Sequence, residues 1–410
     1  MLNINETFKP YINEVWKNSG FSQPTSIQEA AIPAILEGRD LIAEAPTGTG
    51  KTLAYLLPVL EKIDSSSMGL QAVVLASSQE LIMQIYGEFQ KWSEGSEIRG
   101  ATFIGGANVK RQLEKLKKKP HIIFGTPGRL NELIKQKKIK MHEAKTIILD
   151  EADQLLVREH FGPVLDIVKS ALKDCQVVLF SATMKLETEQ LAKNLTRDPE
   201  IIRIKRDETI GGGKVEYIYF SCEPREKMLL LEKIARLEGS KSLAFINDIT
   251  EIPVMAAKLQ FKDLPVGLLH SELGKMERQK AVRDFREGNI NMLIATDVAA
   301  RGLDIQGVTQ VVHVDFPRDF DQFIHRSGRT GRMGADGTVI SLVTEREERE
   351  LKVFARKLGV PVEKRIFYKG KIAVEDIRNL ERGPERKGGQ RNKPQNRPAA
   401  SAKRRPKKTT

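Results

Sequence analysis

Eight consecutive residues have the types and the spacing of a phosphate-binding loop: Ala45, Pro46, Thr47, Gly48, Thr49, Gly50, Lys51 and Thr52. Gly48 and Gly50 let the backbone approach a phosphate closely, so that backbone N–H groups and a helix amino end face the anion. Lys51 can supply a cation for the outer phosphates, and the Thr52 hydroxyl can ligate Mg²⁺. The generic phosphate-loop pattern has glycine at the position where this chain has Ala45.

The segments on either side of this loop predict a strand before it and a helix after it. Asp40–Ala45 is a short apolar run, and Leu53–Lys62 has apolar residues at helical spacing. Pro58 is expected to kink or shorten that helix. A glycine-rich turn without a ligand has a similar composition, but the order strand, glycine loop and helix favours a phosphate site.

A pair of carboxylates, Asp150 and Glu151, follows another strand-like run. One carboxylate can hold the water shell of a nucleotide-bound Mg²⁺, and its neighbour can orient or deprotonate a water that attacks the γ-phosphate. A solvated acidic turn is the alternative. Because the phosphate loop belongs to the same predicted sheet, we favour the interpretation of this pair as a metal-binding residue and a base.

Two polar clusters in the second half of the chain could complete such a site. His325–Arg332 contains three arginines, whose guanidinium groups can neutralise a γ-phosphate, although a solvated surface is the alternative. Thr296–Asp304 is a second polar cluster that follows a strand-like run. A site divided between two linked domains can close on a ligand and open for release.

Strand-like and helical segments alternate on both sides of a glycine-rich stretch, which predicts two doubly wound parallel-sheet α/β domains. In such sheets, ligands bind beyond the carboxyl ends of the strands. The further strand-like runs are 72–75, 121–124, 145–149 and 176–180, then 241–247, 264–270, 292–297, 311–314 and 338–343; the helical stretches include 80–92, 109–118 and 187–195.

The expected organisation has five parts. They are an N-terminal segment (1–30), a first domain (31–205), a flexible linker with three consecutive glycines (206–214), a second domain without its own phosphate loop (215–375) and a basic tail (376–410). The tail has almost no large apolar residues, so we expect it to be disordered.

Composition narrows the function classes. The chain has 410 residues, 40% of them hydrophobic, which is enough for two or three domains with cores. No uncharged apolar run reaches the ~18 residues of a membrane span, and no signal peptide is expected. Two distant cysteines point to a reducing, cytoplasmic location. The net charge is +13, of which residues 382–410 carry +10, so we expect an anionic partner.

These motifs, taken together, resemble the DEAD-box ATP-dependent RNA helicases of superfamily 2, with RecA-like domains, from Phe8 to about Thr344. The layout is similar to the small YfmL-like group of Gram-positive bacteria. The motifs that carry the resemblance are 20–28, Ala45–Thr52, Gly105-Gly106, 126–130, Asp150–Asp153, Ser181–Thr183, 245–247, 295–304 and His325–Arg332.

The resemblance implies a nucleotide site that binds ATP and Mg²⁺. Phe21 would stack on the adenine and Gln28 would read its edge. Lys51 and Thr52 would hold the β- and γ-phosphates and the metal, Asp150 would bind the metal through water, and Glu151 would be the base. Asp304 would contact the ribose, and Arg329 and Arg332 would act as arginine fingers.

The resemblance also implies coupling residues and an RNA track. Ser181 and Thr183, with Asp153 and His325, would couple hydrolysis to strand separation. RNA would be held through its backbone, independently of sequence, by Gly105, Gly106, Thr126, Gly128 and Arg129 in the first domain and by Asn247 and Thr296 in the second. Two departures from the family pattern affect RNA affinity: Gln79 replaces an arginine and Lys275 replaces a glutamine.

The predicted function is ATP hydrolysis coupled to local unwinding of RNA duplexes, with pre-ribosomal particles as expected partners and no membrane. The alternative is an RNA clamp or annealing chaperone in which ATP sets the residence time. A DNA translocase is disfavoured by the segment ending at Gln28 and by Asp150–Asp153.

The basic tail provides a prediction from sequence alone. A chain ending at Glu381 should bind RNA more weakly at low salt, because engaging about five phosphates adds roughly −3.5 to the slope of log K against log salt. The RNA-saturated ATPase rate should stay unchanged, since no predicted catalytic residue lies beyond Arg332. Matched salt titrations of the full and shortened chains measure the slopes, and identical slopes would leave the tail with a solubilising role only.

Overall fold

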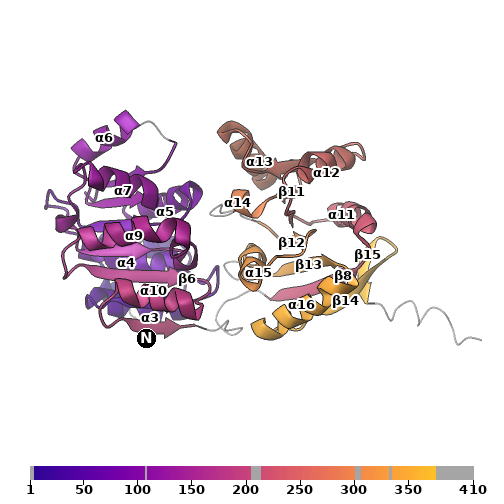
Figure 1. Cartoon of the computed structure of the whole chain (residues 1–410), viewed down its shortest axis with the longest axis horizontal. Helices are drawn as coiled ribbons and strands as arrows, with labels where there is room; N and C mark the ends of the chain where they lie inside the picture. The colour runs from indigo at the N-terminus through magenta and orange to yellow at the C-terminus, as the bar shows by residue number, and fades with distance from the viewer. Residues whose placement is uncertain are drawn as a thin grey trace, which may run out of the picture.

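The computed structural model describes residues 4–106, 109–204, 214–300, 305, 307–331 and 335–374. It shows two α/β units side by side (Figure 1). The expected tail, all of the expected linker except Lys214, and the candidate residues Asp304 and Arg332 lie outside the described residues. Within the described ranges, no helix is long and apolar enough to cross a membrane.

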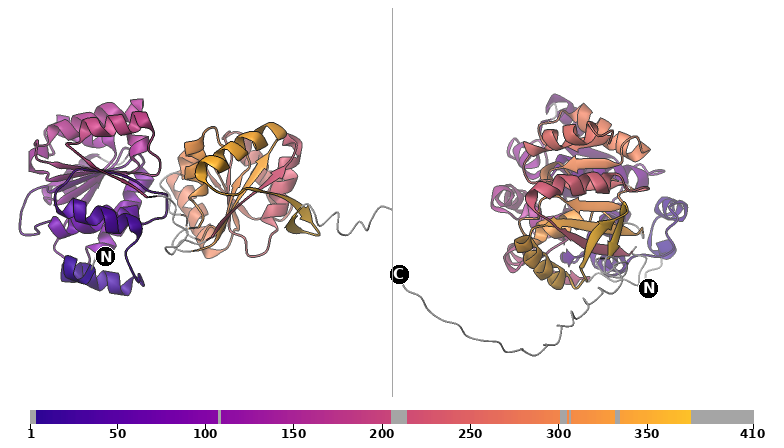
Figure 2. Two further views of the ribbon diagram at one scale, coloured as in Figure 1. Left: turned by 90° about the horizontal axis from the view of Figure 1, so that it is seen from below. Right: turned by 90° about the vertical axis from the view of Figure 1, so that its right-hand side faces the viewer.

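The first unit is built on a seven-stranded parallel sheet with the order β3-β4-β2-β5-β6-β1-β7. Its strands are β1 (Leu41–Glu44), β2 (Ala72–Leu75), β3 (Gly100–Phe103), β4 (Ile122–Gly125), β5 (Thr146–Leu149), β6 (Gln176–Ser181) and β7 (Glu200–Arg203). The central strands are buried throughout, because helices cover both faces of the sheet (Figure 2).

Alternate residues of these strands point into two cores. Val74 and Phe180 pack on one face with the helices before β1 and after β1 and β2, whereas Val73 and Leu179 pack on the other face with the later helices. The helices are α1 (Ile4–Thr7), α2 (Pro10–Asn18), α3 (Ser26–Leu36), α4 (Lys51–Lys62), α5 (Gln79–Trp92), α6 (Val109–Lys117), α7 (Pro127–Lys135), α8 (Ala152–Leu155), α9 (Arg158–Ser170) and α10 (Leu186–Leu195), with a 3₁₀ turn at Met141–Glu143.

The second unit has an eight-stranded sheet with the order β10-β11-β9-β12-β13-β8-β14-β15. The strands are parallel except for the β14–β15 hairpin. They are β8 (Val215–Ser221), β9 (Ser242–Phe245), β10 (Val266–Leu269), β11 (Met292–Ala295), β12 (Gln310–His313), β13 (Gly337–Val343), β14 (Glu363–Tyr368) and β15 (Lys371–Val374). The helices are α11 (Lys227–Ala235), α12 (Glu251–Gln260), α13 (Lys275–Glu287), α14 (Asp297–Ala300), α15 (Phe320–Ser327) and α16 (Glu345–Leu358), with a 3₁₀ turn at Pro224–Glu226.

The structure confirms the two doubly wound units and adds strands that the sequence reading left out. β3 and β7 form the two edges of the first sheet, and each has only four residues. β8 is an inner strand, but it lies directly after the glycine-rich stretch, where no strand was expected. The expected domain boundary at residue 30 falls inside α3.

The expected shortening of the helix after the phosphate loop at Pro58 is wrong. α4 continues four residues past Pro58, and its residues from Leu53 to Leu60 are all buried. A proline inside a helix costs about 3 kcal/mol, whereas each fully buried large apolar side chain contributes roughly 1.5–3 kcal/mol. The packing of Leu57, Val59 and Leu60 therefore outweighs the local preference of Pro58.

Candidate active site

The phosphate loop lies between β1 and α4, as the sequence predicts. Gly48 and Gly50 have φ angles of +81° and +88°, which other residues rarely adopt. The Thr49 hydroxyl donates to the Pro46 carbonyl at 2.8 Å, and the Lys51 ammonium donates to the Ala45 carbonyl at 2.6 Å. The cation of Lys51 is therefore already folded over the loop that would hold a phosphate.

The segment before α3 is tied to this loop through Gln28, which is 3% exposed. Its side-chain oxygen accepts the Thr25 backbone N–H at 3.0 Å, and its side-chain nitrogen donates to the Gly50 carbonyl at 3.3 Å. A Cβ on Gly50 would lie 2.6 Å from that nitrogen. Gly50 is thus required both by its positive φ and by the close approach of Gln28.

Phe21 lies in an aromatic cluster with Trp16 and Trp92 in the first unit. Its ring is parallel to that of Trp92, with centroids 6.4 Å apart, and is tilted against Trp16 at 5.3 Å. One face of the Phe21 ring is therefore covered by protein. Both tryptophans pack in the core.

The carboxylates Asp150 and Glu151 follow β5. Asp150 is 4% exposed, and its side chain accepts hydrogen bonds from the Tyr55 hydroxyl at 2.8 Å and from the Glu151 backbone N–H at 2.9 Å. Burial, together with the charge of Glu151, raises the pKa of Asp150 to about 6. Glu151 has a φ of +51°, and its side chain accepts from the Ser77 hydroxyl at 3.3 Å.

The oxygen donors at this site fit a magnesium ion. A buried carboxylate whose pKa is raised is stabilised in its charged form by a divalent cation, and Mg²⁺ prefers oxygen ligands from one or two carboxylates with substrate phosphates. Asp150 and the nearby Thr52 provide that chemistry. In the described ranges no group of three or more His, Cys, Asp or Glu side chains could hold a metal ion.

Asp153 connects three motifs. Its carboxylate lies 2.6 Å from the Ser181 hydroxyl and 2.7 Å from His325 Nε2, which belongs to the second unit. Burial alone would raise the pKa of Asp153, but the hydrogen bond and charge of His325 and the bond from Ser181 lower it to about 2. The Ser181 hydroxyl also lies 2.6 Å from the Thr183 carbonyl, so it can donate to either acceptor. Among the residues that the structure describes, the buried Thr183 hydroxyl has no hydrogen-bond partner.

Other contacts hold the two units together around this site. Arg278 of α13 pairs with Glu80 of α5 at 2.6 Å, and Lys185 pairs with Asp321 of α15 at 2.5 Å. Gly328 lies so close to the phosphate loop that a Cβ there would be 1.6 Å from the Thr47 hydroxyl oxygen. Arg329, the next residue, is 7% exposed. The structure therefore brings the arginine motif of the second unit against the phosphate loop of the first.

Arg326 has a role that the sequence reading missed. Its guanidinium forms a bidentate pair with Asp297, at 2.7 and 2.6 Å, and donates to the Asp315 carbonyl and to the Asn247 side-chain oxygen. It is 1% exposed. Arg326 therefore holds the loops after β9, β11 and β12 together, whereas the spacing of the three arginines alone does not distinguish it from Arg329.

The residues expected along RNA follow the carboxyl ends of strands in both units. Gly105 and Gly106 come after β3, and Gly128 at the start of α7 has open space where a side chain would be. Gln79 lies next to both glycines, 3.6 Å from the position of a Cβ on Gly105. Thr126 and Arg129 follow β4, and Arg129 pairs with Glu132 at 2.9 Å. In the second unit, Asn247 follows β9 and Thr296 follows β11.

Asn247 is more engaged than the sequence reading expected. Its side chain donates to the Phe316 carbonyl at 3.2 Å and accepts from Arg326 at 2.6 Å. Its amide is therefore part of the Arg326 network, and its backbone N–H donates to Asp315 at 2.8 Å.

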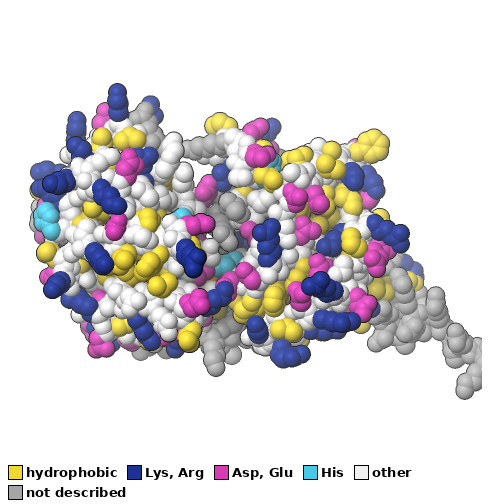
Figure 3. All heavy atoms as spheres, viewed as in Figure 1, with side chains coloured by type: hydrophobic (Ala, Val, Ile, Leu, Met, Phe, Trp, Pro, Cys, Tyr) yellow, Lys and Arg dark blue, Asp and Glu magenta, His cyan; other side chains and the backbone are white. Residues whose placement is uncertain are grey.

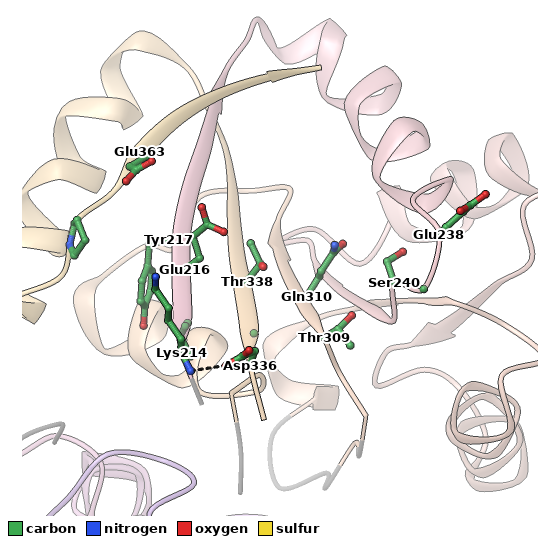
Figure 4. A pocket seen from close by; sticks show the side chains of 14 residues that line it. Lys214, Glu216, Tyr217, Glu238, Ser240, Thr309, Gln310, Asp336, Thr338 and Glu363 are labelled. Atoms are coloured by element: carbon green, nitrogen blue, oxygen red, sulfur yellow. Dashed lines mark hydrogen bonds between the residues drawn. The ribbon is translucent and has the colours of Figure 1, made fainter. Parts of the chain in front are cut away.

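A separate cavity of about 640 Å³ lies at the amino ends of β8, β12 and β13 (Figure 4). The motif residues of the second unit follow the opposite, carboxyl ends of its strands. It is lined by carboxylates that include Glu216, Glu238 and Asp336, the last of which accepts the Lys214 backbone N–H at 2.8 Å. None of the motif residues that the structure describes lines it.

Comparison with known proteins places this site in a family. The DEAD/DEAH box helicase model matches residues 25–191, and the Helicase conserved C-terminal domain model matches residues 225–334. The chain is 52% identical over 365 residues to the probable ATP-dependent RNA helicase YfmL of Bacillus subtilis, covering 89% of this chain and 96% of that protein. It is 49% identical to the DEAD-box ATP-dependent RNA helicase CshC of Bacillus cereus, covering 88% and 92%.

A solved structure agrees with these relatives. Dbp5 of Saccharomyces cerevisiae, bound to RNA and ADP BeF3, has a TM-score of 0.81 to this chain and 28% sequence identity, and the match covers 93% of this chain and 98% of that one. The agreement includes both α/β units.

The close approach of Gly328 to Thr47 provides a test of the closed arrangement. Gly328 has an ordinary φ of −70°, so the backbone tolerates a side chain, and Gly328→Val should act only by keeping the units apart. A displacement of about 1 Å at a reacting group can cost on the order of 10²-fold in rate. We expect that loss in RNA-stimulated ATP turnover, while nucleotide binding to the first unit is retained.

Gly162→Val, on α9 with no atom near its Cβ position, is the matched control and should keep its turnover. Equal turnover of Gly328→Val and the wild type would show that hydrolysis does not need this approach.

Proposed function

Since the chain belongs to the DEAD-box family of ATP-dependent RNA helicases, and is therefore an ATP-hydrolysing enzyme, we propose that its two units close around ATP and an RNA strand and separate after hydrolysis, which locally unwinds RNA duplexes. The observation that carries this proposal is the contact of Ser181, Asp153 and His325, which connects the carboxylate motif to the second unit.

We propose that the phosphate loop holds the β- and γ-phosphates of ATP. Backbone N–H groups between Ala45 and Thr52 face the phosphates, and the Lys51 ammonium exchanges its carbonyl partners for phosphate oxygens. Gln28 and Phe21 contact the adenine, and Asp304 the ribose. Thr52 and Asp150 hold Mg²⁺, which when bound would neutralise charge on the phosphates.

In the same proposal, Glu151 takes the proton from the attacking water. Glu151 is half-buried, and the Ser77 hydroxyl orients its side chain. Its left-handed backbone conformation directs its carboxylate differently from that of Asp150, so two adjacent carboxylates can serve the metal and the water separately. Arg329, held beside the phosphate loop by the close packing of Gly328, and Arg332 stabilise the charge that develops on the γ-phosphate.

Coupling follows from the shared use of Asp153. The Ser181 hydroxyl has one proton and two acceptors, the Asp153 carboxylate and the Thr183 carbonyl. Closure of the second unit brings His325 to Asp153 and changes the competition for that proton. We propose that this exchange carries the nucleotide state to the loop that contains Thr183.

The RNA track is proposed to run over the carboxyl ends of the strands in both units. Small residues at Gly105, Gly106 and Gly128 let backbone N–H groups approach phosphates, and Thr126, Arg129 and Thr296 supply side-chain donors. Contacts of this kind position RNA without reading its bases. Dbp5, which has the same two-unit arrangement, was solved with RNA bound.

We further propose a cytoplasmic role in ribosome assembly, where local and sequence-independent unwinding is needed; its support is the basic composition of residues 382–410.

The competing function is an RNA clamp or annealing chaperone with little unwinding. An unwinding assay separates them, because a helicase releases a labelled strand in the presence of ATP, whereas a clamp changes only the residence time on RNA.

Glu151→Gln is the direct test of the proposed base. Loss of a general base typically lowers the rate on the order of 10²–10⁴-fold, so RNA-stimulated ATP turnover should fall by that factor while ATP binding stays nearly intact. RNA release should also slow, since release follows hydrolysis. Turnover by phosphate release and ATP affinity by a fluorescent analogue are the two measurements.

The exposed Glu159, eight residues further along the chain, provides the control, and Glu159→Gln should behave as the wild type. A wild-type ATPase rate in Glu151→Gln with RNA present would exclude Glu151 as the base.

Arg329→Ala tests the contribution of the second unit. Removal of an arginine finger typically lowers turnover by about 10³-fold or more, and we expect this loss in the RNA-stimulated rate. Arg349→Ala, which removes an exposed arginine of α16, should leave the rate unchanged. Equal rates in both variants would contradict a site shared between the units.

A further inference from the structure

The Tyr55 side chain lies inside the proposed metal site, although its position in the sequence fits a simple core residue. Tyr55 follows Thr52 by one helical turn on α4 and is fully buried. Its hydroxyl donates to Asp150 Oδ2 at 2.8 Å. Thr52 lies three residues before Tyr55 on the same helix, and residues at this spacing share one face of a helix. The Tyr55 hydroxyl thus contacts one of the two residues assigned to Mg²⁺ and belongs to the same helix face as the other.

The Tyr55 ring is held firmly enough to orient its partner. It packs in the core between the sheet and α3 to α5, with the Phe180 ring at 5.4 Å. A tyrosine hydroxyl is protonated at physiological pH, because the usual pKa of a phenol is about 10, so the Tyr55 hydroxyl is a donor.

Asp150 is fixed at both oxygens. Oδ1 accepts the Glu151 backbone N–H at 2.9 Å, and Oδ2 accepts the Tyr55 hydroxyl. Rotation of the carboxylate would break both bonds in a buried place, where an unpaired polar group costs about 1–3 kcal/mol. Each oxygen keeps a further lone pair for a metal-bound water.

We propose that Tyr55 is a positioning residue for magnesium: its hydroxyl holds the Asp150 carboxylate in the arrangement that binds the ion. The inference rests on the proposed roles of Thr52 and Asp150. Phenylalanine would fill the same space in the core but would leave Oδ2 without its donor.

The test measures magnesium binding rather than turnover. In the full chain without RNA, binding of a fluorescent ATP analogue is titrated with Mg²⁺, and the same analogue is titrated in EDTA. Replacing a residue that orients a metal ligand typically lowers metal affinity about 10–100-fold, so Tyr55→Phe should raise the half-saturating Mg²⁺ concentration at least about 10-fold. Its nucleotide affinity in EDTA should remain that of the wild type.

Tyr86→Phe is the matched control, because Tyr86 is a partly buried tyrosine of the same unit whose hydroxyl donates to the Gly100 carbonyl at 3.3 Å. It should keep the wild-type magnesium dependence. An unchanged dependence in Tyr55→Phe would overturn the inference, as would an equal shift in both variants.

Asp150→Asn, measured in parallel, separates this inference from the proposed function. A large shift in Asp150→Asn with none in Tyr55→Phe removes the role of Tyr55 and leaves the metal site, whereas no shift in either removes both. If Tyr55→Phe does not fold, 3-fluorotyrosine at position 55 replaces it. This more acidic phenol is a stronger donor, so tighter magnesium binding supports the inference and unchanged binding overturns it.

Discussion

One buried carboxylate, that of Asp153, joins three motifs across the two units. It belongs to the first unit, but His325 of the second unit provides the partner that, with Ser181, stabilises its charge. Leaving a buried polar group without its hydrogen-bond partner costs about 1–3 kcal/mol, and more when the group is charged. The contact therefore favours the arrangement of the two units that the structure shows.

The lowered pKa of Asp153 also sets where this contact responds to pH. A carboxyl group whose pKa is lower when paired contributes stability above its unpaired pKa and loses that contribution as pH falls through its paired value, here about 2. Near neutral pH the Asp153 carboxylate is therefore fully charged. The closed contact is consequently controlled by the position of the second unit rather than by protonation of Asp153.

The sequence predicted the features that depend on neighbouring residues in the chain. It did not predict the features that depend on contacts between residues far apart in the chain. The glycine conformations of the phosphate loop and the two sheets follow from residue types and periodicity. The edge strands β3 and β7 carry too few apolar residues for a pattern to show. Tyr55 satisfies the apolar spacing of α4, so nothing in the sequence shows that its hydroxyl meets Asp150, 95 residues away.

The same distinction separates Arg326 from Arg329. Both belong to one short motif, and both are buried. Only the structure shows that Asp297 and Asn247 engage Arg326, and that Gly328, which precedes Arg329, approaches the phosphate loop. A buried arginine with a bidentate carboxylate partner is a structural tie, which supports the proposal that Arg329 rather than Arg326 acts on the phosphates.

The departure at Gln79 fits the charges around the proposed RNA track. On the face seen in Figure 3, Lys and Arg side chains alternate with Asp and Glu, and the first 381 residues carry a net charge of only +3. Beside Gln79, Glu80 would repel a phosphate, but Arg278 of the second unit pairs with it at 2.6 Å. This pairing requires closure, so the acidic residue is neutralised when the units are together. With a neutral amide at Gln79 beside Gly105 and Gly106, this part of the proposed RNA track has a hydrogen-bond donor in place of a fixed cation. Because Gln79, Gly105 and Gly106 all belong to the first unit, their arrangement does not depend on the second unit, whereas the neutralisation of Glu80 does.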